Sequence, residues 1–198
     1  DCLLSRGLGD VYKRQMDNYY VSKLIPLMRE AGVAAIANPL INITLQGRHD
    51  TYPKRRGMTR VPELLAAGVP VAFGHDCVMD PWYSLGSGDM LEVAHMGLHV
   101  AQMTGQDAMR ACFEAVTTTP AKILGLDDTG IAVGKRADLV LLQARDAVEA
   151  LRLRATRLMV LRAGNVIATT PPATATLNLP GRPGQVSFQT PVSYTHLT

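Results

Sequence analysis

The most informative pattern of apolar and polar residues lies between Val69 and Trp82, which reads VPVAFGHDCVMDPW. An apolar run rich in valine reaches Gly74 and then turns polar at His75 and Asp76. A run this short and this apolar predicts a strand buried on both faces, as in a parallel sheet. Asp76 would then lie at the carboxyl end of the strand, where α/β barrels place catalytic groups and metal ligands.

The segments before this strand predict a βαβ unit. Residues 33–37 form a second apolar run that ends at Asn38-Pro39, and residues 61–67 fit a short helix in which Thr59 is the expected cap. The order strand, helix, strand favours two parallel neighbours in one sheet. Residues 40–58 are predicted to form a long loop, which is typical of functional segments.

Helical spacing of apolar residues and the positions of turn residues predict the remaining elements. A helix capped by Asp17 or Asn18 ends at Gly32, and a second helix, capped by Asp89, is expected at 90–104. Further helices are expected at 106–116 and 119–124. Beyond Asp127 the sequence favours short strands at 139–142, 157–162 and 165–168, with a hairpin turn at Ala163-Gly164. From residue 169 onward proline and threonine dominate, and we expect a weakly ordered tail.

Composition narrows the class of protein. The chain has 198 residues, of which 47% are hydrophobic, enough for a substantial core. A whole barrel needs roughly 250 residues, so we expect a piece of a larger protein. The net charge of +3 gives no basic stripe of the kind that binds nucleic acid. Three cysteines favour a reducing, cytoplasmic location, and we expect neither a signal peptide nor a membrane span.

Both ends of the sequence look foreign to a natural protein. The strings DVYKRQ at 10–15 and VSYTH at 192–196 can be encoded by the two arms of one inverted DNA repeat. A transposon adapter used in sequencing libraries would leave such a pair. We therefore expect residues 1–15, and those from about 191 on, to be derived from an adapter, and they take no part in the fold prediction.

A longer pattern identifies a family. The string FGHD followed by DPWY, together with NPLINITLQGRHDTYPKRRG upstream, resembles the cytosine deaminase branch of the amidohydrolase superfamily, over about residues 16–180. The resemblance implies an α/β fold in which residues 16–126 are the C-terminal part of a (β/α)8 barrel. The GK-ADLVLL pattern resembles the small β-sandwich that flanks such barrels, which implies part of a sandwich over 127–180 and a tail over 181–198.

The same resemblance implies roles for three side chains. Asp76 corresponds to the aspartate that binds one divalent ion, Fe²⁺ or Zn²⁺, and that assists proton transfer. Trp82 corresponds to the tryptophan that lies against the pyrimidine ring. Cys77 stands where well-characterised members carry a second aspartate that contacts the base, so Cys77 is expected to contact the substrate and to alter the preference for a base.

The expected activity is hydrolysis of a carbon–nitrogen bond in a cyclic amidine, the deamination of cytosine to uracil and ammonia by the intact parent. The remaining metal ligands and the catalytic glutamate belong upstream in the family, so the fragment itself is expected to be inactive. Two alternatives stay open: a hydrolase for isocytosine, creatinine or another ring, and a truncated domain without catalysis. The expected partners are a nucleobase and further copies of the chain, with no nucleic acid and no membrane.

Two other features favour packing over chemistry. His95 and His99 are four residues apart on a predicted helix, a spacing that can bind zinc, but no second motif completes the site. Cys112 lies on the apolar face of its helix, which is typical of an inert core thiol.

Overall fold

The computed structural model describes residues 16–54 and 59–186. The chain divides into two units, residues 1–129 and residues 130–198, and each is considered by itself. The segments expected to derive from an adapter, residues 1–15 and the end from about 191, lie outside the described residues. Their origin and the domain bounds of the sequence analysis stay predictions.

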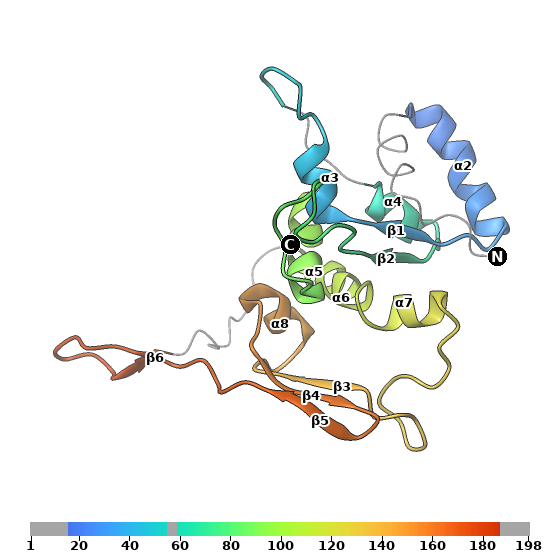
Figure 1. Cartoon of the computed structure of the whole chain (residues 1–198). Coiled ribbons are helices and arrows are strands. Elements are labelled where there is room, and N and C mark those ends of the chain that lie inside the picture. Colours follow the sequence, from blue (N-terminus) through green and yellow to red (C-terminus); the bar gives the residue numbers. More distant parts are fainter. Residues whose placement is uncertain (1–15, 55–58, 187–198) are drawn as a thin grey trace. The chain divides into compact units, whose positions relative to one another are not determined.

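The first unit is built on a parallel pair of strands, β1 (Ala35–Ala37) and β2 (Val71–Phe73). Ala35 pairs with Val71 and Ala37 with Phe73, and the two strands lie side by side in Figure 1. Every residue of β2 is buried, as expected of a parallel strand covered on both faces. Both predicted strands and their parallel pairing are therefore confirmed, each over a shorter range.

Helix α2 (Asn18–Glu30) precedes β1, and helix α4 (Val61–Ala66) lies between β1 and β2 in the chain. The Asp17 carboxylate accepts a hydrogen bond from the Tyr20 backbone N–H at 2.9 Å, which confirms the predicted cap. The predicted cap at Thr59 is wrong, because the N-cap of α4 is Arg60 and no side chain caps that helix. Instead, the backbone carbonyl of Thr59 accepts from the Val61 N–H at 2.7 Å.

The predicted loop over 40–58 is also partly wrong, because it begins with a helix, α3 (Pro39–Leu45). Asn38-Pro39 ends the strand as expected, but a proline in the first turn also starts a helix, since its missing N–H has no partner there in any case. Leu40 and Ile41 are buried, so this helix is held by packing of its apolar residues.

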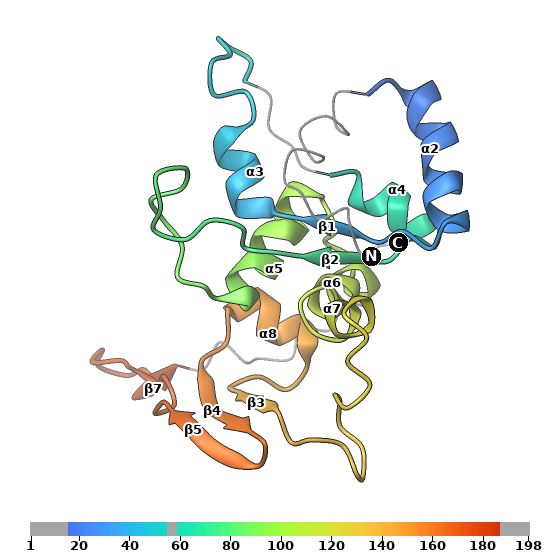
Figure 2. The same ribbon diagram turned by 45° about the vertical axis from the view of Figure 1, so that its right-hand side comes forward.

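Three helices follow β2: α5 (Met90–Val100), α6 (Gln106–Glu114) and α7 (Thr118–Ile123). The Asp89 carboxylate caps α5 by accepting from the N–H groups of Leu91 and Glu92, as predicted. Figure 2 shows α5 next to β2, where Gly97 leaves room for the Phe73 ring. The helix therefore covers one face of the strand that leads to Asp76.

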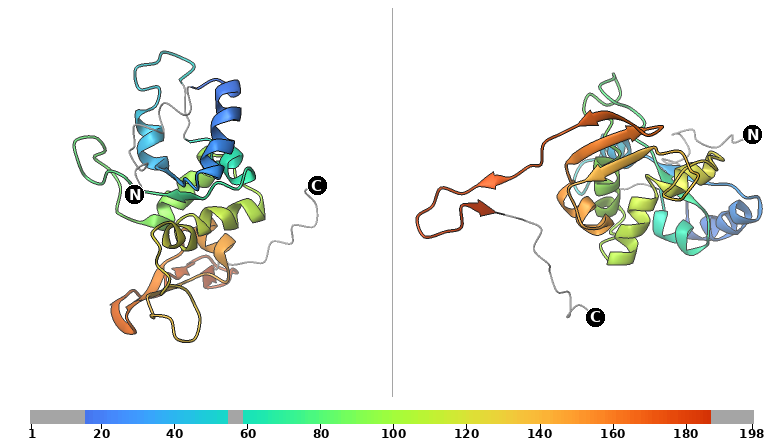
Figure 3. Two further views of the ribbon diagram at one scale, coloured as in Figure 1. Left: turned by 90° about the vertical axis from the view of Figure 1, so that its right-hand side faces the viewer. Right: turned by 90° about the horizontal axis from the view of Figure 1, so that it is seen from below.

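The second unit contains an antiparallel sheet in the order β3 (Leu139–Leu142), β4 (Arg157–Arg162), β5 (Asn165–Thr169), drawn in orange tones in Figure 3. The turn between β4 and β5 has positive φ at both Ala163 and Gly164, which is the conformation of a type I′ hairpin. The predicted strands and hairpin are confirmed.

Two parts of the second unit differ from the sequence prediction. A helix, α8 (Ala147–Leu153), lies between β3 and β4, and it is capped by the Asp146 carboxylate, which accepts from the Glu149 N–H at 2.8 Å. The expected weakly ordered tail contains an antiparallel pair of short strands, β6 (Ala175–Thr176) and β7 (Gln185–Val186). Within the described ranges, no helix has the length and apolar character to cross a membrane.

Candidate functional site

The candidate site lies at the carboxyl ends of β1 and β2. Because the strands are parallel, the residues that follow each of them meet at one edge of the pair. The ladder is extended by a hydrogen bond from the Gly74 N–H to the Ala37 carbonyl at 2.9 Å. This brings Asn38, the residue after β1, next to Asp76, the third residue after β2.

The Asp76 carboxylate is exposed and has a donor on each oxygen. The Asn38 side-chain amide donates from Nδ2 to Oδ2 at 3.0 Å, and the Cys77 thiol donates to Oδ1 at 3.2 Å. Two donors restrict the rotation of the carboxylate while they leave lone pairs for another ligand, since an ionised carboxylate offers about four acceptor positions. The side chain predicted to bind a metal is therefore accessible and oriented.

The backbone at Asp76 is in the left-handed region, with φ of 66°. This conformation is uncommon for residues other than glycine and is found preferentially at functional sites. Next to it, His75 Nδ1 lies 2.8 Å from the Cys77 carbonyl oxygen. A carbonyl can only accept, so Nδ1 carries the proton and donates. This bond closes the turn around Asp76.

The His75 ring is buried, with 8% of its surface exposed, and Tyr83 contacts it edge to face at 6.2 Å between ring centroids. Its other nitrogen, Nε2, has no hydrogen-bond partner within the described part of the chain. A Cβ atom on Gly86 would overlap the imidazole, so the loop after β2 folds back on the ring at a residue without a side chain.

Trp82 lies in that loop, at a tight turn organised by Asp80. The Asp80 carboxylate accepts from the backbone N–H groups of Trp82 and Tyr83, both at 2.9 Å. These bonds lower the pKa of Asp80, because they stabilise its charged form. Trp82 itself is 72% exposed. Its expected place against a substrate ring stays a prediction.

Cys77 is held as a neutral thiol. Desolvation by burial, and then the carboxylates of Asp76 and Asp80, raise the pKa of Cys77 to about 12. A thiol with such a pKa is a hydrogen-bond donor and a poor nucleophile. The structure thus gives Cys77 a donor role toward Asp76, and its predicted contact with a substrate stays a prediction.

Asn38 is a neighbour of Asp76 that the sequence prediction did not include. Asn-Pro predicts the end of a strand, and a polar residue at the carboxyl end of a buried strand is the same signal that singles out Asp76. The register of the two strands sets the distance between the two side chains, and no local pattern contains it.

The other sequence candidates do not extend the site. In the described part of the chain, no group of three or more His, Cys, Asp or Glu residues could hold a metal ion. The rings of His95 and His99 lie 4.6 Å apart, and His99 Nδ1 donates to the His95 carbonyl at 2.7 Å, which occupies that nitrogen within the helix. Cys112 is fully buried, so its predicted place in the core is confirmed. Desolvation raises its pKa to about 12, and its inertness stays a prediction.

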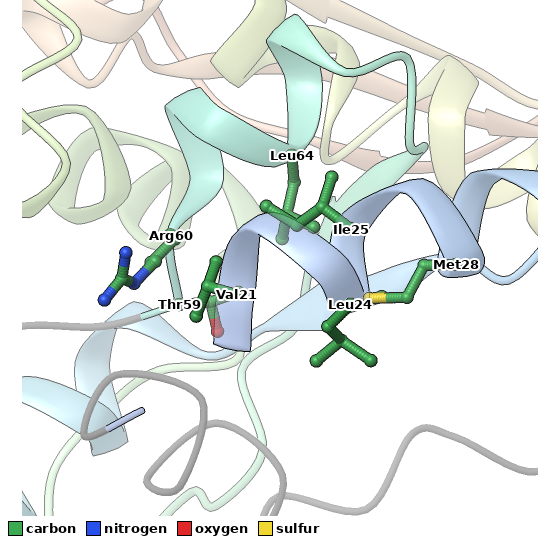
Figure 4. A pocket seen from close by; sticks show the side chains of 7 residues that line it. All are labelled: Val21, Leu24, Ile25, Met28, Thr59, Arg60 and Leu64. Atoms are coloured by element: carbon green, nitrogen blue, oxygen red, sulfur yellow. The ribbon is translucent and has the colours of Figure 1, made fainter. Parts of the chain in front are cut away.

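A small hollow between α2 and α4 is a gap in the packing rather than a binding site. It is lined by Val21, Leu24, Ile25, Met28, Thr59, Arg60 and Leu64. Figure 4 shows the Arg60 guanidinium pointing away from the apolar side chains. Its nitrogens donate to the Asn18 side chain and the Met16 carbonyl, both at 2.9 Å.

Comparison with known proteins shows the family to which the chain belongs. The sequence profile of the amidohydrolase family matches residues 6–168. The chain belongs to the amidohydrolase family. The fold of this family is of the TIM-barrel type, and its members generally bind a divalent metal. The predicted fold class and the predicted need for a divalent metal are therefore confirmed for the family.

Three relatives illustrate the range of the family near this chain. A pterin deaminase from Rhizobium rhizogenes (strain K84 / ATCC BAA-868) is 39% identical over 155 residues, which are 77% of this chain and 35% of that protein. An N-isopropylammelide isopropyl amidohydrolase from Pseudomonas sp. (strain ADP) is 32% identical over 149 residues, 75% of this chain and 34% of that protein.

The third is a solved structure, the 5-methylcytosine deaminase from Klebsiella pneumoniae liganded with 5-fluorocytosine. It is 40% identical, with a TM-score of 0.78 over 86% of this chain and 41% of the solved one. The chain thus spans about a third of the length of the curated relatives it matches.

Proposed function

We propose that the chain is the part of a metal-dependent deaminase that supplies one metal ligand and one face of the substrate site, and that the whole protein hydrolyses the exocyclic amine of cytosine or a close analogue. The observation that carries the proposal is the Asp76 carboxylate, exposed at the end of a buried parallel strand and oriented by Asn38 and Cys77. The 40% identity to a 5-methylcytosine deaminase supports the choice of substrate class.

The donor set fits a divalent ion only in part. An oriented, accessible carboxylate is a suitable ligand for Fe²⁺ or Zn²⁺, and Asp76 provides one. One carboxylate does not hold a catalytic ion, and the described residues contain no larger cluster, so the proposal requires further ligands from elsewhere in the whole protein. When bound, the ion supplies Lewis acidity that lowers the pKa of water to near neutrality.

The residues of this chain would then have separate tasks. Water adds its oxygen to the ring carbon that bears the amine, and the bond from that carbon to nitrogen breaks. One proton ends on the departing nitrogen, which leaves as ammonia, and the other on the ring nitrogen. Asp76 would carry a proton between these positions, because it lies just beyond the carboxyl end of β2 and is accessible. Trp82, exposed on the adjacent loop, would cover the flat face of the ring.

Cys77 bears on which ring is accepted. Cys77 donates its one S–H proton to Asp76, so toward a base it offers only a weak sulfur acceptor, where a carboxylate would accept strongly. A second candidate is therefore deamination of a pterin, favoured by the 39% identity to a pterin deaminase. Isocytosine and creatinine stay among the candidate substrates, and so does the alternative of a domain without catalysis.

The test is an ammonia-release assay on the whole protein loaded with Fe²⁺ or Zn²⁺. Cytosine, 5-methylcytosine, isocytosine, creatinine and pterin would be offered separately. We expect Asp76→Asn to lower kcat by about 10²–10⁴-fold, the usual contribution of a group that moves protons. Asp107→Asn is the matched control, because its carboxylate is exposed and pairs with Arg110 on the surface.

Trp82→Ala should raise KM by roughly 2- to 12-fold, the equivalent of about 0.5–1.5 kcal/mol of ring stacking. Full activity in Asp76→Asn would refute the assignment of the site. Ammonia from none of the five rings, with metal bound, would favour the domain without catalysis.

A further inference from the structure

We infer that Asn38 is a positioning residue for Asp76, and that Gly74 is part of the same device because it provides the space that the Asn38 amide occupies. The inference rests on the proposed role of Asp76 and adds a residue to it. The juxtaposition comes from the register of β1 and β2 and from no local sequence motif.

The first observation is the use that the structure makes of the Asn38 side chain. Asn38 is the N-cap of α3, a position at which asparagine usually accepts a hydrogen bond from the helix, yet no side-chain cap bond forms there. Its amide turns instead to Asp76 and donates from Nδ2 to Oδ2 at 3.0 Å. The Asn38 side chain therefore does not cap its own helix, and it forms a hydrogen bond with a residue 38 positions later in the chain.

The second observation is burial. Asn38 is 9% exposed, whereas Asp76 is exposed, so the amide supports the carboxylate from the protein side and leaves its outer side open. A carboxylate can only accept, which fixes the orientation of the amide: the NH₂ faces Asp76 and Oδ1 faces the other way. This is the arrangement in which an outer residue orients a metal ligand without touching the metal.

The third observation is Gly74. A Cβ atom built on Gly74 would overlap Oδ1 of Asn38 and would lie 3.3 Å from Cγ2 of Ile36. The atom that must move is therefore the end of the Asn38 side chain, whose other end holds Asp76. Gly74 is not among the residues with positive φ, so alanine is compatible with the backbone there. Gly74→Ala should consequently act on Asp76 mainly through Asn38, with a smaller displacement of Ile36.

The experiment compares variants of the whole metal-loaded protein. Asn38→Leu keeps the branched shape of the side chain and removes the donor, whereas Asn38→Ala removes both. We expect each to weaken metal binding by about 10- to 100-fold in a chelator competition, the usual effect of losing an outer-shell partner. The kcat should fall by a similar factor with KM changed less than about threefold, because the substrate does not contact Asn38.

Gly74→Ala should reproduce these losses, and the double variant Asn38→Ala with Gly74→Ala should be no worse than Asn38→Ala alone, since the truncated side chain leaves room for the methyl group. Gly105→Ala is the matched control: it has the same chemical change, negative φ and no atom within 4 Å of the added methyl. It should leave metal affinity and kcat unchanged.

Three outcomes separate the possibilities. Wild-type metal affinity and kcat in Asn38→Leu would overturn the inference, because filled volume alone would then suffice. Multiplied effects in the double variant would overturn the link to Gly74. Wild-type metal affinity in Asp76→Asn would instead remove the proposed role of Asp76. Should Asn38→Leu fail to fold, Gly74→Ala carries the test, since it keeps the amide and only displaces it.

Discussion

Two substitutions of His75, by asparagine and by glutamine, should differ in stability by the contribution of a single hydrogen bond. The His75 Nδ1 donates to the Cys77 carbonyl at 2.8 Å, and its Nε2 has no partner within the described ranges. The side-chain amide of asparagine can replace an Nδ1 donor, whereas that of glutamine reaches the position of Nε2. His75→Asn should therefore keep the bond that closes the turn around Asp76, and His75→Gln should lose it.

The magnitude follows from what each variant removes. Both lose the ring and its edge contact with Tyr83, so that loss cancels in the comparison. What remains is one hydrogen bond and a part-buried carbonyl left without its donor, a cost of about 1–3 kcal/mol. We expect His75→Asn to be more stable than His75→Gln by this amount, although both are less stable than the wild type.

Urea unfolding monitored by circular dichroism would measure the two free energies of unfolding under identical conditions. The slope of each transition should be the same, so the difference appears as a shift of the midpoint. The free energy of unfolding of His75→Ala should be closer to that of His75→Gln than to that of His75→Asn, because His75→Ala also lacks the donor. Equal stability of the two amide variants, or a more stable glutamine variant, would show that Nδ1 does not close the turn.

Two further predictions concern packing and thiol chemistry. Gly97→Ala should destabilise the protein by about 1 kcal/mol, because its methyl would lie 2.5 Å from Cε2 of Phe73, and overpacking of about 1–3 kcal/mol outweighs a gain of about 1 kcal/mol in helix propensity. In a protein that also carries Phe73→Leu, Gly97→Ala should instead be stabilising, as measured by urea unfolding in a double-mutant cycle. Additive free-energy changes for the two substitutions would contradict the packing argument. In a protein that carries Cys2→Ser, Cys77 and Cys112 should react with a thiol reagent at pH 8 at least a hundredfold more slowly than free cysteine. A pKa of about 12 leaves roughly a thousandfold less thiolate at that pH, and the reaction rate should rise with pH up to the pKa. Asp80→Asn should speed labelling of Cys77 and leave Cys112 unchanged, because it removes a charge that raises the pKa of Cys77 alone; equal rates at Cys77 in the two proteins would contradict this.

The sequence by itself determined the elements that depend on local chemistry. The apolar run before Gly74 predicts β2, the Asp17 and Asp89 caps predict the starts of α2 and α5, and Ala163-Gly164 predicts the hairpin turn. The family followed from the long string between residues 38 and 57 together with FGHD and DPWY. For the strand, the caps and the turn, the signal lies within a few residues, where backbone preferences and capping act.

Tertiary structure alone decided how the site is held. That Asn38 leaves its own helix cap to bind Asp76, and that Gly74 is small because the amide needs its space, both depend on the pairing of two strands about 36 residues apart. The start of α3 in a predicted loop was likewise decided by burial of its apolar residues. Hydrogen bonds and contacts between distant segments are set by register and packing, and the order of residues along the chain does not encode their distances directly.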